Sequence, residues 1–333
     1  MKRSILVILI LALLIFCAEK VQQEDVRVSY QPTWHHVALF VIVEKGWDKK
    51  VLGKELKITK FPTGPEQMSA FAAGEHDIAY VGAAPPLSLI ARGYKAKIVA
   101  VANVEGSSII SQPDLVYDGP KSFEGKTVMT FPPGSIQHTL LLSWLKESGV
   151  DLNKVNIKFG DAAEIREALR ARAIDLGFVP DPTPYIALKE GYAKILIHSK
   201  DFAPNHPCCV ILMREDFISK ENAKKFLALH IIASEYASDP KNKDEIEKIL
   251  IKWLGIREDV AETFPGTTNL QTDPRNKEWL KGLQKLCYAQ YEAKLTKNEK
   301  GEVILLKTED IVYLKLYEEA LELVPKIKKE LGL

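Results

Sequence analysis

Loops of small residues follow two of the apolar runs in this chain, and such loops can bring backbone amides close to a solute. Ile78–Val81 is an apolar run of strand length, and Gly82, Ala83, Ala84 and Pro85 follow it directly. Small residues let a ligand approach the backbone, and proline is tolerated in a first helical turn. The segment is typical of a ligand-binding loop between a strand and a helix, or of an ordinary tight turn.

A similar loop follows the run KTVMTF at positions 126–131 and precedes a helix predicted from about 135 to 148. The loop residues that could contact a solute are Gly134, Ser135, Ile136 and Gln137. Thr63 and Gly64 precede another predicted helix, which Thr63 can cap. Because the first amides of a helix lack intrahelical partners, the helix starts at 83–84 and 135–136 predict donors suited to an anion.

Three ring side chains, Trp34, His35 and His36, fall in the first turn of a helix predicted over 34–45, directly after the strand predicted over 26–30. Such a turn faces the groove above a sheet, so these rings are candidate ligand contacts; each histidine could equally have a surface or capping role. Metal binding by the histidines needs a third ligand, and the sequence does not locate one. We therefore predict no metal site and no cofactor.

The elements that carry these loops alternate regularly between strand and helix. Strands predicted near 26–30, 56–61, 78–81 and 97–102 are separated by helices, which indicates a parallel, doubly wound sheet with ligand loops at one end. The alternation restarts with strands near 126–131, 154–159, 175–179 and 193–198. Cys208–Met213 is a further strand, and the pattern after Glu215 is helical.

Composition excludes some partner classes. The 333 residues include 45 Lys and Arg against 44 Asp and Glu, so nothing global points to nucleic acid. The cysteines beyond Cys17 are Cys208, Cys209 and Cys287, which cannot form a disulfide framework. Cys208 and Cys209 open an apolar run, and we predict that they are small buried strand residues.

The first residues predict export. Met1–Arg3 is basic, and the apolar run Ser4–Phe16 is shorter than the roughly 20 residues that a membrane-spanning helix needs. Cys17 closes this run as a lipid-attachment cysteine would, although Phe16 replaces the usual small residue before it. We expect residues 1–17 to be a signal or lipoprotein segment, with 18–25 as a polar tether; an uncleaved anchor is the alternative.

Two equivalent loops in two restarting α/β blocks suggest a clamshell with its ligand in the hinge cleft. The segments YQPTWHH, FPTGPEQMSAFAAGEHDIAYVGAAP, FEGKTVMTFPPGSIQHTLL and AIDLGFVPDPTPY resemble the solute-binding proteins of ABC importers for nitrate, sulfonates, taurine and thiamine-precursor pyrimidines. The resemblance covers about 26–213. It implies a type II periplasmic-binding-protein-like fold, with lobe one at 26–110 and 208–333, lobe two at 111–207, and a helical C-terminal tail.

The resemblance also implies where the ligand is bound. Its contacts would fall on Trp34–His36, Thr63–Gly64, Gly82–Ala84, Ser107–Ser108, Gly134–Gln137 and Asp181. The chain would act as a monomer, tethered at Cys17 outside the cell membrane, and would deliver its solute to a permease and an ATPase.

The ligand chemistry remains open between two classes. None of these loops contains lysine or arginine, so a small oxyanion or sulfonate would rest on amides, hydroxyls and a protonated His35. A pyrimidine-like heterocycle stacked on Trp34, with Asp181 accepting a hydrogen bond from its amine, would explain the same residues. Asp181 could instead stabilise the proline-rich turn around it.

Two other classes of protein are weighed against a transport role. A pyrimidine synthase is similar to these proteins and uses a cysteine-rich segment and histidines; Cys208–Cys209 with His206 resembles it faintly, but the longer cysteine cluster is missing. A sensor module would need a fused output domain, which the sequence does not show. The sequence also lacks a GxxxxGK[ST] loop and a nucleophile elbow, so we predict a binding protein with no catalytic residues.

Overall fold

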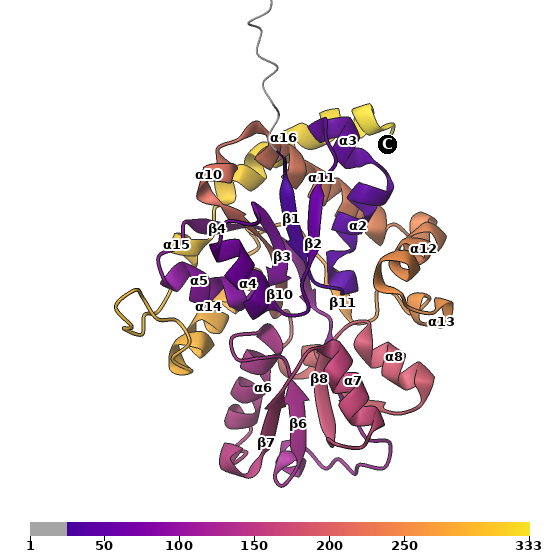
Figure 1. The fold of residues 1–333 in the computed structure, drawn as a ribbon, viewed down its shortest axis with the longest axis vertical. Helices are drawn as coiled ribbons and strands as arrows, with labels where there is room; N and C mark the ends of the chain where they lie inside the picture. The colour runs from indigo at the N-terminus through magenta and orange to yellow at the C-terminus, as the bar shows by residue number, and fades with distance from the viewer. Residues whose placement is uncertain (1–24) are drawn as a thin grey trace, which may run out of the picture.

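Buried strands such as β3 (Ile78–Gly82) and β10 (Pro207–Arg214) form where short apolar runs end at a glycine, a proline or a polar turn. The computed structural model describes residues 25–333, and its strands make two sheets, one in each of two lobes (Figure 1). The first sheet has the strand order β11-β4-β10-β3-β1-β2. Its strands are β1 (Arg27–Tyr30), β2 (Lys57–Lys60), β3 (Ile78–Gly82), β4 (Ala96–Glu105), β10 (Pro207–Arg214) and β11 (Thr268–Leu270).

The first sheet is mixed rather than wholly parallel. β1 pairs in parallel with β2 and with β3, as the alternating pattern predicted. β10 lies between β3 and β4 and runs antiparallel to both. A strand from late in the chain thus separates two strands that are consecutive in the sequence, an insertion that the local pattern does not encode.

The second sheet has the order β7-β6-β8-β5-β9. Its strands are β5 (Ser107–Ser111), β6 (Thr127–Thr130), β7 (Asn156–Phe159), β8 (Leu176–Pro180) and β9 (Lys194–His198). β6 is parallel to β7 and β8, whereas β5 is antiparallel to β8 and β9. The parallel strands end at the edge that faces the first lobe, which places their following loops there.

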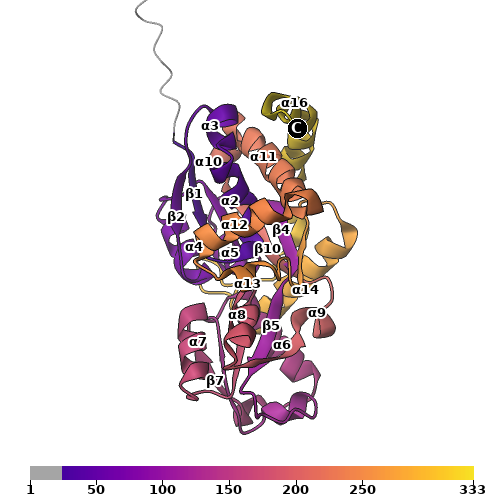
Figure 2. The same cartoon turned by 90° about the vertical axis from the view of Figure 1, so that its right-hand side faces the viewer.

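Helices of the first lobe surround its sheet, and the C-terminal segments all return to this lobe (Figures 1 and 2). The helices before the crossing are η1 (Trp34–His36), α2 (Val37–Glu44), α3 (Trp47–Leu52), α4 (Gly64–Ala72) and α5 (Pro85–Ala91). Those after it are α10 (Glu215–Ile218), α11 (Glu221–Ser238), η4 (Pro240–Asn242), α12 (Lys243–Leu254), α13 (Glu258–Ala261), α14 (Lys277–Glu292), α15 (Thr308–Ile311) and α16 (Leu314–Leu331). The predicted helical tail is therefore confirmed.

Helices of the second lobe lie on both sides of its sheet (Figure 1), and α6 (Ile136–Glu147) is 12 residues long. They are η2 (Pro120–Phe123), α6 (Ile136–Glu147), η3 (Leu152–Lys154), α7 (Ala162–Arg170), α8 (Thr183–Glu190) and α9 (Ser199–Phe202). α7 begins with a capping box, in which the Asp161 carboxylate accepts from Ala163 and Glu164 amides and Glu164 accepts from the Asp161 amide. Such caps fix where the helices begin, and hence which amides remain free.

The chain crosses between the lobes twice. β4 ends at Glu105 and β5 begins at Ser107, so the first crossing is at Gly106, which has a positive φ of 85°. The second crossing lies between Phe202 and Pro207. The boundary predicted between 110 and 111 falls inside β5, because the apolar run there pairs with β8 and β9 of the second sheet.

Each lobe has its own core. The first lobe buries Trp34, Phe40, Tyr80, Phe226 and Trp279 together in one cluster. The second lobe has two smaller clusters, on opposite sides of its sheet. Among the described residues, no helix combines the length and the apolar character needed to cross a membrane. The predicted signal segment, Cys17 and most of the tether lie outside the described residues.

Candidate solute site between the lobes

A cavity of about 40 Å³ lies where the strand-end loops of both lobes meet. One water needs roughly 10–15 Å³ of such space, so the cavity has room for a few waters or for a solute of few heavy atoms. It is lined by Gln31, Pro32, Thr33, His35, Pro62, Gly64, Gly82, Pro85, Phe131, Ser135, Ile136, Gln137, Ala162, Pro180, Thr183 and Cys209. The sequence predicted His35, Gly64, Gly82, Ser135, Ile136 and Gln137 as contacts.

The start of α6 presents two backbone donors to the cavity. Ser135 is the N-cap, and its hydroxyl oxygen accepts a hydrogen bond from the His138 amide at 3.2 Å. Ile136 and Gln137 are the first two residues of the helix, so their amides have no intrahelical acceptor. Both residues line the cavity, and the positive end of the α6 dipole lies there with them.

Two more helices begin at the cavity. Gly64 is the first residue of α4, from lobe one, and Thr183 is the first residue of α8, from lobe two. The Thr63 hydroxyl oxygen caps α4 by accepting from the Glu66 amide at 3.5 Å, so Thr63 acts on the helix rather than on the cavity. Helix starts from both lobes thus face one small space.

The start of α5 does not supply the donors that the sequence predicted at Ala83 and Ala84. The Ala83 amide donates instead to the Cys208 carbonyl oxygen at 2.7 Å, because β10 lies beside β3. Pro85 and Pro86 open the helix and have no amide hydrogen. Ala83 and Ala84 are fully buried, and only Gly82 and Pro85 of this loop line the cavity.

Trp34 and His36 turn away from the cavity. The Trp34 ring is fully buried against Tyr185 and Phe264, and its Nε1 donates to Thr268 Oγ1 at 2.9 Å. His36 packs edge-on against Tyr80 in the core of lobe one, and burial holds its pKa well below the usual value. Stacking of a heterocycle on Trp34 is therefore not supported, because protein groups already enclose the ring.

His35 lies on the cavity wall and faces two sulfur atoms. Its Nε2 donates to the Gly106 carbonyl oxygen at 2.9 Å, and its Nδ1 lies 3.6 Å from the Sγ atoms of both Cys208 and Cys209. Burial alone would lower the pKa of His35, yet Cys208 and Asp181 nearby raise it. The structure thus places two sulfur atoms, which could serve as metal ligands, beside His35, where the sequence could not locate any further ligand.

The two cysteines are buried free thiols, as predicted, but they differ electrostatically. A hydrogen bond from the Cys209 thiol, together with the nearby His35, holds the pKa of Cys208 well below its usual range. Burial raises the pKa of Cys209 well above its usual range. The two neighbouring sulfurs therefore differ in how readily they ionise, and Cys208 is the more acidic of the two.

Asp181 links the lobes rather than lining the cavity. Its Oδ2 accepts from the Thr267 amide at 3.1 Å and from the hydroxyls of Thr267 and Thr268 at 3.2 and 3.1 Å. Burial raises its pKa, against the opposing effect of His35. Thr267 and Thr268 precede or begin β11, in a segment that the sequence predicted only as a turn-rich gap.

Three predicted contacts lie next to the cavity without lining it: Ser107, Ser108 and Gly134. The Gln137 side chain donates to Ser107 Oγ at 3.2 Å, and Ser108 Oγ is hydrogen-bonded to His198 Nδ1 at 2.8 Å. Gly134 has a positive φ of 87°, which lets the chain turn into the N-cap of α6. These predicted contacts position other residues rather than line the cavity.

Some lining residues were missed by the sequence reasoning. Thr33 and Thr183 each follow a proline just after a predicted strand. Because such positions face the groove above a sheet, the sequence could have predicted both as lining residues. Phe131 and Cys209 lie in predicted strands, and only the tertiary arrangement turns them toward the cavity.

The site contains no cationic side chain among its described lining residues. Its polarity comes from amides, hydroxyls and one imidazole, as the sequence predicted for the loops. A larger groove of about 630 Å³ lies elsewhere on lobe one, lined partly by Lys97, Glu215, Lys220 and Glu221. Charges of both signs on its wall, and its position away from the strand-end loops, make that groove a poorer candidate than the cavity between the lobes.

Residues 19–251 match the sequence model of the NMT1-like family, which is well over half of the chain. The chain belongs to the NMT1-like family. A curated relative of this NMT1-like protein in Brachyspira hyodysenteriae is named as an ABC transporter periplasmic binding protein; the two are 27% identical over 81% of this chain and 83% of the relative.

Solved structures show the same fold. The periplasmic aliphatic sulphonate binding protein SsuA from Escherichia coli has a TM-score of 0.74 and 20% identity, over 89% of this chain and 99% of SsuA. The periplasmic nitrate-binding protein NrtA from Synechocystis has a TM-score of 0.75 and 14% identity, over 92% of this chain and 90% of NrtA. The NMT1-like chain therefore has the fold of periplasmic binding proteins, which confirms the predicted two-lobed α/β architecture.

Proposed function

We propose that this NMT1-like protein is the extracytoplasmic solute-binding subunit of an ABC importer, and that it binds a small oxyanion or an organosulfonate between its lobes. The observation that carries the proposal is the meeting of helix starts from both lobes, at Gly64, Ile136 and Thr183, on one small cavity. The relatives named as ABC transporter, sulphonate-binding and nitrate-binding proteins support the transport role.

The lining suits an anion although it has no cationic side chain. Free amides at Ile136 and Gln137 can each donate to an oxyanion, and each helix start adds about 0.3–2 kcal/mol through its dipole. The cavity of about 40 Å³ fits an oxyanion, or the head group of a sulfonate, better than a planar heterocycle. Buried Trp34 removes the main argument for a pyrimidine.

Binding would act through closure of the two lobes. Solute that contacts Gly64 of lobe one and Ile136 of lobe two gains its full set of donors only when the lobes are together. Its differential affinity for the closed form then shifts the population toward closure. A permease that recognises the closed form would receive the solute, and an ATPase would drive release.

The test is a ligand screen with the full-length protein in detergent. Thermal melting and titration calorimetry would compare nitrate, bicarbonate, taurine, alkanesulfonates and pyrimidines. A solute at about 100 times its Kd adds about 2.7 kcal/mol of stability. A shift with an oxyanion or a sulfonate supports the proposal; a shift with a pyrimidine alone would refute the ligand class.

A substitution of one amide would sharpen this screen. Ile136→Pro removes the amide hydrogen at the first helical position, where proline is favoured, and Ser135 already has the extended ψ of 164° that a residue before proline needs. Ile136→Val is the matched control, because it keeps the amide. A lost hydrogen bond to an anion corresponds to about 1.5–3 kcal/mol, a 10- to 150-fold weaker Kd for Ile136→Pro alone.

We further propose that the protein works as a monomer tethered outside the membrane through a lipid on Cys17. The basic start and the short apolar run before Cys17 motivate this. Mass spectrometry of the membrane-extracted protein should show a lipid-modified N-terminal cysteine. Cys17→Ser should lose this modification, so that the protein either appears in the soluble fraction or keeps residues 1–16 uncleaved. Unmodified Cys17 in the membrane fraction would contradict the lipid anchor.

A further inference from the structure

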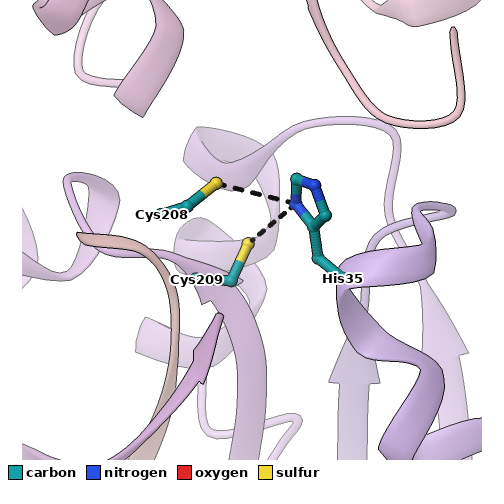
Figure 3. A group of neighbouring side chains, drawn as sticks. All are labelled: His35, Cys208 and Cys209. Atoms are coloured by element: carbon teal, nitrogen blue, oxygen red, sulfur yellow. Dashed lines mark hydrogen bonds between the residues drawn. The ribbon is translucent and has the colours of Figure 1, made fainter. Parts of the chain in front are cut away.

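The side chains of His35, Cys208 and Cys209 point toward one another (Figure 3), and His35 and Cys209 line the cavity. His35 Nδ1 lies 3.6 Å from Cys208 Sγ and 3.6 Å from Cys209 Sγ. The three atoms all lie within 4.8 Å of one another, and all three residues are buried. They come from η1 and β10, which are far apart in the sequence.

An irregular strand brings both cysteines to the same histidine. Successive side chains of a regular strand point to opposite faces, so adjacent cysteines would normally separate. β10 has register shifts against β4 between Pro207 and Cys209 and between Cys209 and Val210. The backbone is held there by the Cys209 amide, which donates to Asn103 Oδ1 at 3.1 Å. The irregularity is what lets both sulfurs face His35.

The two nitrogen–sulfur separations match those of a tetrahedral metal site. Zn²⁺ binds thiolate sulfur at about 2.3 Å and imidazole nitrogen at about 2.0–2.1 Å, which at a tetrahedral angle separates nitrogen from sulfur by about 3.6 Å. Both observed separations are 3.6 Å. Nδ1 cannot make a straight hydrogen bond with both sulfurs at once, whereas one metal ion can bind all three atoms.

The second ring nitrogen of His35 is arranged as in metal-binding histidines. Its Nε2 donates to the Gly106 carbonyl oxygen at 2.9 Å, which fixes the ring and leaves Nδ1 directed at the sulfurs. Metal-ligating histidines almost always donate their other N–H to a carbonyl or a carboxylate. Thiolates and imidazole together favour Zn²⁺ among common divalent ions.

We propose that His35, Cys208 and Cys209 bind one Zn²⁺ ion, with the fourth coordination position open to the cavity between the lobes. The thiol protons leave to solvent when the ion binds. Because His35 and Cys209 line the cavity, a water or an anion there can complete the tetrahedron. The ion would also supply a Lewis acid to a lining that has no lysine or arginine. The site does not depend on which solute the cleft takes.

The experiment is a metal titration of reduced, metal-free, full-length protein. Calorimetry with Zn²⁺ against a competing chelator should give one ion per chain, and Co²⁺ in its place should show thiolate-to-cobalt charge-transfer absorption. Cys208→Ser/Cys209→Ser should weaken binding at least 100-fold and abolish that absorption. Cys287→Ser is the matched control, since Cys287 is also a buried free thiol but lies on α14.

The outcomes separate clearly. Absence of a stoichiometric Zn²⁺ site in the wild-type protein would overturn the proposal, as would equal binding by the double variant and by Cys287→Ser. Binding of Cu⁺ without Zn²⁺ would overturn the assignment of the metal. The Co²⁺ spectrum of the wild-type protein tests thiolate ligation even if the double variant folds poorly. None of these readings depends on solute binding, so a failed solute screen leaves them intact.

Discussion

Thr33 Oγ1 donates a hydrogen bond of 2.6 Å to the Asp181 carbonyl oxygen and so joins the two lobes directly beside the cavity. Thr33 follows the first strand of lobe one, and Asp181 follows β8 of lobe two. Gln290 Nε2 on α14 also donates a hydrogen bond across the lobes, to Thr139 Oγ1 on α6, at 2.6 Å. Polar contacts between the lobes thus hold them together in the described conformation.

Thr33→Val should open the cleft. The variant keeps the side-chain shape but leaves the buried Asp181 carbonyl without its donor, at a cost of about 1–3 kcal/mol to the closed form. We expect a larger radius of gyration in solution scattering and a roughly 5- to 150-fold weaker solute Kd. Thr59→Val, at an exposed position of β2, is the control; the same scattering and affinity in both variants would rule out the role of Thr33.

Asp181→Ala should destabilise the whole protein. The carboxylate accepts three hydrogen bonds from Thr267 and Thr268, and its loss leaves these buried donors unpaired. We expect a fall of about 2–4 kcal/mol in the free energy of unfolding, measured by urea denaturation. Asp118→Ala, on an exposed loop of lobe two, should change it by less than about 0.5 kcal/mol. Equal effects would contradict a linking role for Asp181.

Gly82→Ala should impair binding without impairing folding. A methyl group there would lie 3.5 Å from Ile136 Cγ2, an ordinary contact, and would project into the cavity. Crowding of a filled site costs about 1–3 kcal/mol, or 5- to 150-fold in the solute Kd. Gly64→Ala is the contrast, because its methyl would lie 2.5 Å from Pro85 Cγ and should lower the Tm as well. Calorimetry and melting distinguish the two.

His138 should contribute to loss of stability in acid. Burial lowers its pKa from 6.5 to about 4. Between these values the unfolded chain binds a proton that the folded chain does not, so stability is full above pH 6.5 and falls as the pH drops toward 4. At pH 4.5 the loss is about 2.5 kcal/mol.

His138→Leu should remove this part of the pH dependence. The His138 ring packs against Phe159, and its Nδ1 has no partner among the described residues, so leucine fits the surroundings. Urea denaturation at pH 7 and pH 4.5 measures the difference between the two conditions, which should be smaller for the variant. An unchanged difference would show that His138 titrates normally in the folded protein.

Local pattern predicted most of the strands and helices and the loops at their ends. Ile78–Gly82 and Pro207–Arg214 formed strands as expected, because short apolar runs closed by turn residues specify a buried strand locally. The insertion of β10 between β3 and β4 depends on packing between distant segments. The sequence could not show this insertion. The Ala83 amide was therefore predicted to be free for a ligand, although it donates to the Cys208 carbonyl oxygen of β10.

The site was predicted unevenly for the same reason. Ser135 and Gln137 were found because a helix start is a local feature. Trp34 and His36 face inward because 34–36 form a 3₁₀ turn, in which consecutive side chains point in different directions. The meeting of His35 with Cys208 and Cys209 joins positions that are 173 and 174 residues apart in the sequence, and their types gave no sign of it.

Four prolines, Pro32, Pro62, Pro85 and Pro180, form part of the cavity wall, drawn from both lobes. Proline has a fixed φ, so this wall loses its freedom when the chain folds rather than when a solute arrives. This part of the wall would move little to improve the fit of a poorly matched solute. Selectivity in this protein would then rest on a rigid template, with domain closure as the single movable part, and changes of specificity would require new residues rather than new conformations.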